Sequence, residues 1–84
     1  NIITKFKGQN FIDELRVSWA CQIADFYKTN QKYLKSIAVF ESIIAKHPKA
    51  IRPLQGISDV YNLIGQYKKA KHYTQKAEAL ATVN

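Results

Sequence analysis

The chain reads IADFYKTNQKYLK at residues 23–35 and ISDVYNLIGQYKK at residues 57–69. Ile, Asp, Tyr, Tyr and Lys take the same places in both stretches, and an Ala follows each stretch ten residues later. A period of 34 residues is typical of proteins built from stacked helix pairs, because one pair alone cannot bury its apolar face. The sequence therefore predicts an all-α fold made of two similar helical hairpins.

Around these stretches we expect four helices, over about residues 11–29, 32–46, 50–64 and 67–81. Asn10 is expected as the N-cap of the first helix, and Asn30 as the left-handed residue that follows it. His47-Pro48 ends the second helix, because the residue before a proline disfavours the helical conformation. Pro53 fits the first turn of the third helix, and Gly65 ends it. Loops this short predict that neighbouring helices are antiparallel. Residues 1–9 are ambiguous, and Gly8 is a candidate end for an earlier helix.

Apolar residues recur at spacings of three and four within each helix, and we expect them to face the core. In order along the chain they are Phe11, Leu15, Trp19, Ile23 and Phe26; Tyr33, Ile37, Phe40, Ile43 and Ile44; Leu54, Ile57, Val60, Tyr61 and Ile64; and Ala70, Tyr73, Ala77 and Leu80. Small residues are expected where two helix backbones approach closely, at Ala24, Ser36, Ser58 and Ala70.

This pattern resembles the tetratricopeptide repeat, whose motif combines small, aromatic and closing proline positions on two helices. In residues 17–50 these slots hold Ala20, Ile23-Ala24, Tyr27, Ser36, Phe40 and Pro48. In residues 51–84 they hold Leu54, Ile57-Ser58, Tyr61, Ala70, Tyr73 and, in place of proline, Thr82. The resemblance implies a right-handed superhelical stack of antiparallel helix pairs, preceded by residues 1–16, which lead into the first long helix. Tyr27, Tyr33, Tyr61 and Tyr67 would be large plugs between its helices.

The end of this stack is expected to leave apolar surface uncovered. Only two complete units are present, whereas such stacks usually need three or more, and no polar capping helix is recognisable. The strip formed by Ala70, Tyr73, Ala77 and Leu80 would then be exposed. Three alternatives remain for what covers this strip: other parts of a longer parent protein, a second copy of the chain, or a ligand helix.

The resemblance also implies that the first helix of each pair lines a groove that holds a peptide. The candidate contact residues are Asp25, Lys28, Arg52, Gln55, Asp59 and Asn62. The Lys, Asn and Arg clamp known from the family is absent, which disfavours a receptor for chaperone tails. Asp25 and Asp59 take equivalent places and would favour a partner with Lys or Arg. The alternative is local pairing, as between Asp25 and Lys28 three residues later.

A second surface is basic, in keeping with the net charge of +7. Its residues are Lys68, Lys69, Lys71 and Lys76, with His72 between them and Lys32 and Lys35 nearby. Such a patch can meet nucleic-acid phosphates, an acidic protein or an anionic membrane surface. It can equally be a solvated helix face, and the tyrosines that would stack on bases are expected to be packed inside.

Other classes of function find little support in the sequence. One cysteine, Cys21, forms no internal disulfide, and His47 and His72 lack zinc-ligand spacing. No apolar run is long enough for a transmembrane helix, and no glycine-rich phosphate loop occurs. We therefore expect no catalysis, cofactor or metal. Because the sequence begins at Asn1 without an apolar signal core, we interpret it as a segment cut from a longer, cytoplasmic protein.

These observations favour a protein–protein interaction module, a scaffold or adaptor segment that binds another protein or a peptide in its groove. Two alternatives stay open at this point. One is anion or nucleic-acid binding through the basic face of the last helix. The other is homodimerisation through the apolar strip at its C-terminal end.

Overall fold

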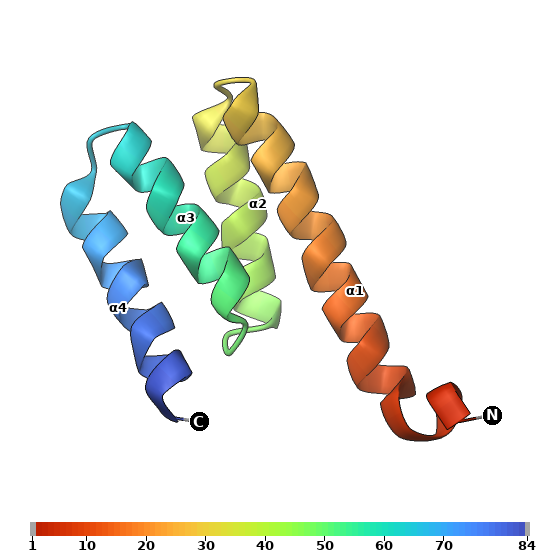
Figure 1. The fold of residues 1–84 in the computed structure, drawn as a ribbon. Coiled ribbons are helices and arrows are strands. Elements are labelled where there is room, and N and C mark those ends of the chain that lie inside the picture. Colours follow the sequence, from red (N-terminus) through yellow and green to blue (C-terminus); the bar gives the residue numbers. More distant parts are fainter. Residues whose placement is uncertain (1, 84) are drawn as a thin grey trace.

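The computed structural model describes the backbone of residues 2–83 and the side chains of residues 14–82. It contains four α-helices and, between residues 2 and 83, no strand: α1 (Ile2–Thr29), α2 (Tyr33–Lys46), α3 (Ile51–Leu63) and α4 (Tyr67–Val83). Loops of three or four residues join the helices, so that each runs antiparallel to the one before it (Figure 1). The prediction of an all-α fold with four helices is confirmed.

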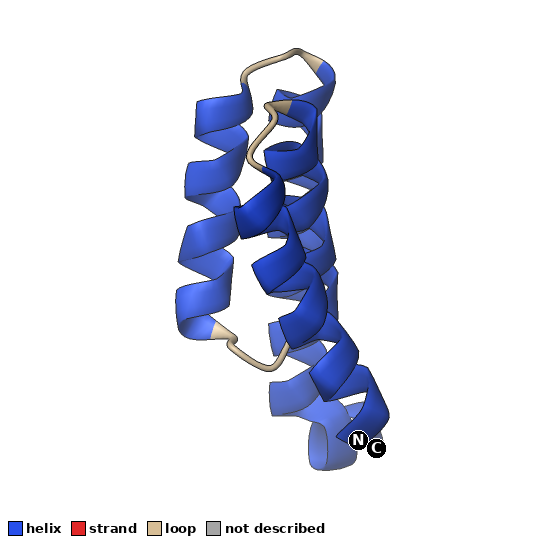
Figure 2. Cartoon of the chain, turned by 90° about the vertical axis from the view of Figure 1, so that its left-hand side faces the viewer, coloured by secondary structure: helices blue, strands red, loops and turns tan. Residues whose placement is uncertain are grey.

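The four helices form two hairpins that pack side by side. α1 packs against α2 and α3 packs against α4, while α2 joins the two hairpins by packing against α3 as well. α1 and α3 touch each other far less. Viewed from the side, α2 lies on one side of the other helices (Figure 2). α1 and α3 are therefore held together mainly through α2.

The corner of each hairpin is built from the same backbone hydrogen bonds. At the first corner the Lys32 N–H donates to the Tyr27 carbonyl over 2.8 Å, and at the second the Gln66 N–H donates to the Tyr61 carbonyl, also over 2.8 Å. Both donor and acceptor of the second bond lie 34 residues after those of the first. The period seen in the sequence is therefore also a period of the backbone.

The left-handed residue lies one position later than expected at the first corner and at the expected position at the second. Gln31 has a φ of 61° and Gly65 a φ of 81°. The assignment of Asn30 to this conformation was wrong, because the Asn30 side chain instead caps α1 by donating a hydrogen bond to the Phe26 carbonyl over 2.8 Å. The assignment of Gly65 is confirmed. A glycine adopts this conformation without strain, whereas the Cβ of Gln31 opposes it.

Exchanging these two residue types is expected to move stability in opposite directions. Gln31→Gly should stabilise the fold by about 0.5–1 kcal/mol, since it relieves left-handed strain, and Gly65→Gln should destabilise it by about 1–2 kcal/mol. Urea unfolding followed by circular dichroism measures both changes. Each variant serves as the control for the other, because the two corners have equivalent backbone hydrogen bonds. Stability changes of the same sign in both variants would contradict a left-handed strain at Gln31.

The large side chains of the core come from the inward faces of α2 and α3. The most buried apolar side chains of these two helices are those of Ile37, Phe40, Ile43, Leu54, Ile57, Val60 and Tyr61. All seven were predicted to face inward from their spacing. Tyr33 and Ile44 pack against this core at its margin. The apolar pattern therefore identified the buried faces of the two central helices, except at Ile64, which was expected in the core but lies just after α3 and is 36% exposed.

The expected close approaches between helices are also confirmed. At each of them a serine hydroxyl donates a hydrogen bond to the facing helix. The Ser36 hydroxyl on α2 donates to the Ala24 carbonyl on α1 over 2.8 Å. In the second hairpin the Ser58 hydroxyl on α3 donates to the Ala70 carbonyl on α4 over 2.9 Å. The positions are equivalent, but serine and alanine have exchanged helices. Each hairpin therefore has one serine bonded to the facing carbonyl at its crossing, and in the second hairpin the Thr74 hydroxyl of α4 also lies 2.6 Å from that of Ser58.

The beginning of α1 differs from the prediction. Because the backbone is helical from Ile2 onward, Asn10 lies inside the helix and does not cap it. Gly8 likewise lies within α1 and does not end an earlier helix. A glycine inside a helix is unfavourable by only about 1 kcal/mol relative to alanine, so it does not by itself break one. Asn10 resembled a cap only because its residue type is common there.

The orientation of α1 also differs from the prediction. Its large apolar residues were expected in the core, yet Trp19 is 68% exposed and Phe26 is 64% exposed. α1 instead turns its small residues toward α2, with Cys21 and Ala24 almost completely buried. α1 carries two apolar stripes, and spacing alone does not tell which of them packs. Phe11 lies outside the described side chains.

Two expectations at the C-terminal end were wrong. The strip on α4 is not exposed, because Ala70 and Ala77 are buried and Tyr73 packs against the core. Tyr67, expected as a buried plug, is 69% exposed. Its counterpart Tyr33 is partly buried, because it packs against the core. No helix in the described part of the chain covers the corresponding side of Tyr67.

Candidate functional site

The predicted groove residues come together on one face of the molecule. Eight residues of α1, α2 and α3 line a hollow of about 200 Å³: Cys21, Asp25, Lys28, Phe40, Arg52, Gln55, Gly56 and Asp59. Five of the six candidate contact residues are among them. The sixth, Asn62, lies about one helical turn beyond Asp59 and is exposed. α1 and α3 form the walls of this hollow, and α2 contributes a single ring.

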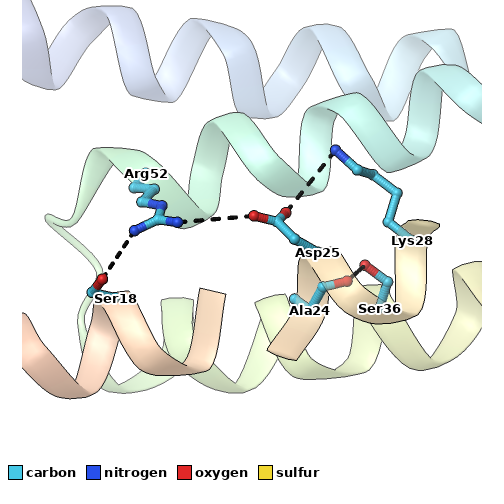
Figure 3. A network of polar contacts seen from close by, with 6 residues as sticks. All are labelled: Ser18, Ala24, Asp25, Lys28, Ser36 and Arg52. Atoms are coloured by element: carbon cyan, nitrogen blue, oxygen red, sulfur yellow. Dashed lines mark hydrogen bonds and ion pairs between the residues drawn. The ribbon is translucent and has the colours of Figure 1, made fainter. Parts of the chain in front are cut away.

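Asp25 lies at the centre of a polar network between α1 and α3. The Arg52 guanidinium donates a hydrogen bond to the Ser18 hydroxyl over 3.1 Å and lies 3.9 Å from the Asp25 carboxylate (Figure 3). The Lys28 ammonium lies 4.0 Å from the same carboxylate. The local pair between Asp25 and Lys28 is thus confirmed, whereas the longer reach of Arg52 was not predicted. Each exposed ion pair stabilises the fold by only about 0–1 kcal/mol. The main effect of the network is therefore to orient these side chains.

Asp59 takes the equivalent place in the second hairpin but has different surroundings. It is exposed, and no ion pair reaches it among the side chains of residues 14–82. Asn62 stands where the first hairpin has Lys28, which removes the cation from its own helix. The two carboxylates of the groove are therefore different: Asp25 is compensated by two cations, and Asp59 is available.

A larger hollow continues from the groove at Arg52. It has a volume of about 790 Å³ and is lined by Glu14, Val17, Ser18, His47, Pro48, Lys49, Ala50 and Arg52. Arg52 lines both hollows, so they adjoin at its side chain; we call the two together the trough, which lies between α1 on one side and α3 with the loop before it on the other. The sequence identifies His47-Pro48 only as a stop signal for α2. Its place beside α1 follows from the short loop, which turns the chain back toward the first helix.

The floor of the groove depends on a glycine that the sequence did not single out. The Phe40 ring, 1% exposed, lies directly under Gly56 of α3. A Cβ at Gly56 would stand 2.5 Å from Cε1 of that ring, well inside van der Waals contact. Only a residue without a side chain allows α2 and α3 to pack at this depth. The close approach depends on the register of two helices, which a single sequence does not reveal.

The hollow contains one thiol, which is buried. Cys21 is 1% exposed, and burial raises the pKa of its thiol above the ordinary value, with Arg52 opposing and Asp25 adding to the shift. A thiol with a raised pKa is a weak nucleophile at neutral pH. Among the described side chains no three His, Cys, Asp or Glu residues lie close enough to bind a metal ion. The side chains that line this hollow can therefore contact a ligand through hydrogen bonds and charge.

The basic surface on α4 is partly engaged with rings of the same chain. The Lys69 ammonium lies 5.5 Å from the centre of the Tyr61 ring, and that of Lys76 lies 5.7 Å from the Tyr73 ring. The Lys68 and Lys71 side chains are exposed. Glu41 of α2 lies beside Tyr61, and burial together with this carboxylate raises the pKa of the Tyr61 hydroxyl.

A hollow of about 370 Å³ lies on this surface. It is lined by Glu41, Tyr61, Lys68, Lys69, His72 and Tyr73. The carboxylate of Glu41 would oppose an anion in this hollow. The structure brings Lys68 and Lys69 of the basic patch together here, but it places an acidic residue with them.

Known proteins offer no guide to this site. No protein-family model, no curated protein and no solved structure matches the chain. In the part of the chain that the structure describes, none of the helices is both long and apolar enough to cross a membrane. Function must therefore be argued from the geometry of the site.

Proposed function

We propose that the chain is a protein–protein interaction module that binds a peptide along the trough between α1 and α3. The observation that carries this proposal is the lining of the groove. Contact candidates chosen from equivalent positions of two hairpins line one hollow, and Arg52 connects it to a larger one. A trough with hydrogen-bonding and apolar parts suits an extended or helical peptide.

The residues of the trough indicate the kind of peptide. Val17, Pro48 and Ala50 give the larger hollow apolar surface that would take an aliphatic side chain. Asp59, exposed and without an ion pair among the described side chains, would pair with Lys or Arg. Asp25 is already compensated by Lys28 and Arg52. The proposed ligand is therefore a segment with an aliphatic residue and, farther along, a basic one.

We propose further that the two hairpins are tetratricopeptide-like units stacked in a right-handed superhelix. The support is the 34-residue period together with equivalent hydrogen bonds at both corners and both helix crossings. Such stacks commonly hold other proteins, which agrees with a cytoplasmic adaptor or scaffold segment. Lys68 and Lys69 give little support to an anion-binding function of their hollow, since Glu41 shares it.

Peptide selection against the intact chain tests this proposal. A random dodecapeptide display library should yield sequences enriched in Lys or Arg together with an aliphatic residue. Asp59→Lys should weaken the binding of a selected peptide roughly tenfold or more, because a charged pair becomes a repulsion. Fluorescence anisotropy with labelled peptide measures this.

Glu78→Lys is the matched control, because it makes the same charge change at an exposed position on α4. It should leave the affinity within about twofold, since exposed charges at a distance are largely screened. Equal losses in the two variants would refute a specific role for Asp59. A library that yields no enriched sequence would refute peptide binding in the trough.

A further inference from the structure

One face of α1 exposes four large apolar side chains in a row. We call this face the α1 stripe; its residues and their exposed fractions are Leu15 (52%), Trp19 (68%), Ile23 (41%) and Phe26 (64%). They recur at spacings of three and four, so they lie along one side of the helix. Contiguous apolar surface of this kind is uncommon on a monomer and marks an interaction site.

The second hairpin shows what covers such a face. Moving 34 residues along the chain, Trp19 corresponds to Pro53, Ile23 to Ile57 and Phe26 to Val60. These three counterparts on α3 are all buried. α3 differs from α1 in having α2 packed against it on the side of the preceding hairpin, as the contact of Phe40 with Gly56 shows. The same helix face is thus covered in one hairpin and bare in the other.

We propose that the α1 stripe is a docking surface for an amphipathic helix of another protein, which lies on α1 as α2 lies on α3. This surface is distinct from the trough and goes beyond the peptide-binding function proposed above. It is formed by one helix alone, and none of its four residues lines the trough.

The shape of the α1 stripe restricts the docking helix. Gln22 stands where α3 has Gly56, so an aromatic ring cannot enter there as Phe40 does. A hollow of about 200 Å³ beside it is lined by Trp19, Gln22, Ile23, Phe26 and Tyr27. This space suits a single aliphatic side chain. The docking helix should therefore have an aliphatic ridge with a small residue opposite Gln22.

The last helix of a second copy does not meet this description. α4 carries polar residues where α2 has apolar ones: Lys71, Thr74 and Glu78 replace Ile37, Phe40 and Ile44. All three replacements are exposed. Burying them against the α1 stripe would leave polar groups without partners, which is unfavourable. Head-to-tail stacking of copies through α4 is therefore disfavoured, and the occupant is a helix with the apolar character of α2.

The probe that tests this proposal is a synthetic peptide of residues 31–49, which contain α2, with the change Phe40→Ala. Trp19 is the only tryptophan of the chain and lies in the α1 stripe, and the peptide has none. Its emission should shift to shorter wavelength as the peptide is added to the intact protein. Ile23→Glu should weaken this binding at least tenfold, because it places a charge in the buried ridge.

Three controls make the outcome decisive. Leu34→Glu puts the same charge at an apolar position of α2 that is 79% exposed and should leave binding unchanged. Asp59→Lys should also leave it unchanged, which separates the α1 stripe from the trough. A peptide with the same residues in scrambled order should cause no shift.

Four outcomes would overturn the proposal. One is the absence of any shift at millimolar peptide, and another is an equal shift with the scrambled peptide. A third is unchanged binding in Ile23→Glu. The fourth is a blue shift of Trp19 that grows with protein concentration without peptide while the sedimenting mass doubles. That result would assign the α1 stripe to a second copy of the chain.

Discussion

Replacing Phe40 with alanine is expected to destabilise the fold by about 3–5 kcal/mol, which is the usual range for removing a buried aromatic side chain. The ring is 1% exposed and fills the space beneath α3 at Gly56. Because Phe40 belongs to the helix that joins the two hairpins, the cavity would open at the larger of the contacts between them. A chain of 84 residues has a total stability of about 4–13 kcal/mol, so much of it would be lost.

Guanidinium unfolding followed by circular dichroism measures this loss. Leu34→Ala on the same helix is the control, because Leu34 is 79% exposed and its removal should change stability by less than about 0.5 kcal/mol. A loss below about 1 kcal/mol in Phe40→Ala would show that the hairpins are not joined through this ring. The slope of the unfolding transition should stay constant if the change is in stability alone.

Adding a single methyl group at Gly56 is expected to destabilise the same junction from the other side. Overpacking of a filled core is unfavourable by about 1–3 kcal/mol, against which alanine regains about 1 kcal/mol of helix propensity. The Phe40 ring cannot swing away, because it is buried. Gly56→Ala should therefore lower stability by up to about 2 kcal/mol. It should also weaken peptide binding, since both residues line the groove.

The double variant Gly56→Ala/Phe40→Leu distinguishes a steric clash from other causes. A shorter side chain makes room for the methyl group, so the second change should be less harmful in the double variant than alone, by about 0.5–3 kcal/mol. Gln22→Ala is the control at the equivalent place on α1. Gln22 is exposed, so that change should be neutral or slightly stabilising. Strict additivity of the two changes at the junction would contradict direct contact between them.

The sequence was informative wherever a residue's role depends on its own helix and hairpin. The burial of Ile57 and Val60, the stop at Pro48 and the left-handed Gly65 follow from spacing and backbone geometry, and all are found. The gathering of the groove residues also followed, because equivalent positions on α1 and α3 face the same way. Local periodicity and a repeat are enough for these features.

The features that the sequence did not reveal depend on which neighbour a helix has. Trp19 and Ile57 occur in similar apolar stripes, yet one is exposed and the other buried, because only α3 has a helix packed on that side. Tyr67 is exposed for the same reason, since no described helix packs on its side, whereas Tyr33 packs against the core. The reach of Arg52 to Asp25 likewise depends on the offset between two hairpins, which no single helix encodes.

The exchange of serine and alanine at the two helix crossings has a consequence for how such a chain can be recombined. Moving α2 into the place of α4 would bring Ser36 against Ser58, and the reverse transplant would bring Ala70 against Ala24. The first chimera would place two serines against each other and replace Thr74, the present neighbour of the Ser58 hydroxyl, whereas the second would lose the serine hydrogen bond altogether. Whole hairpins are thus the smallest interchangeable parts, and duplication or swapping at the level of single helices would yield mismatched pairs.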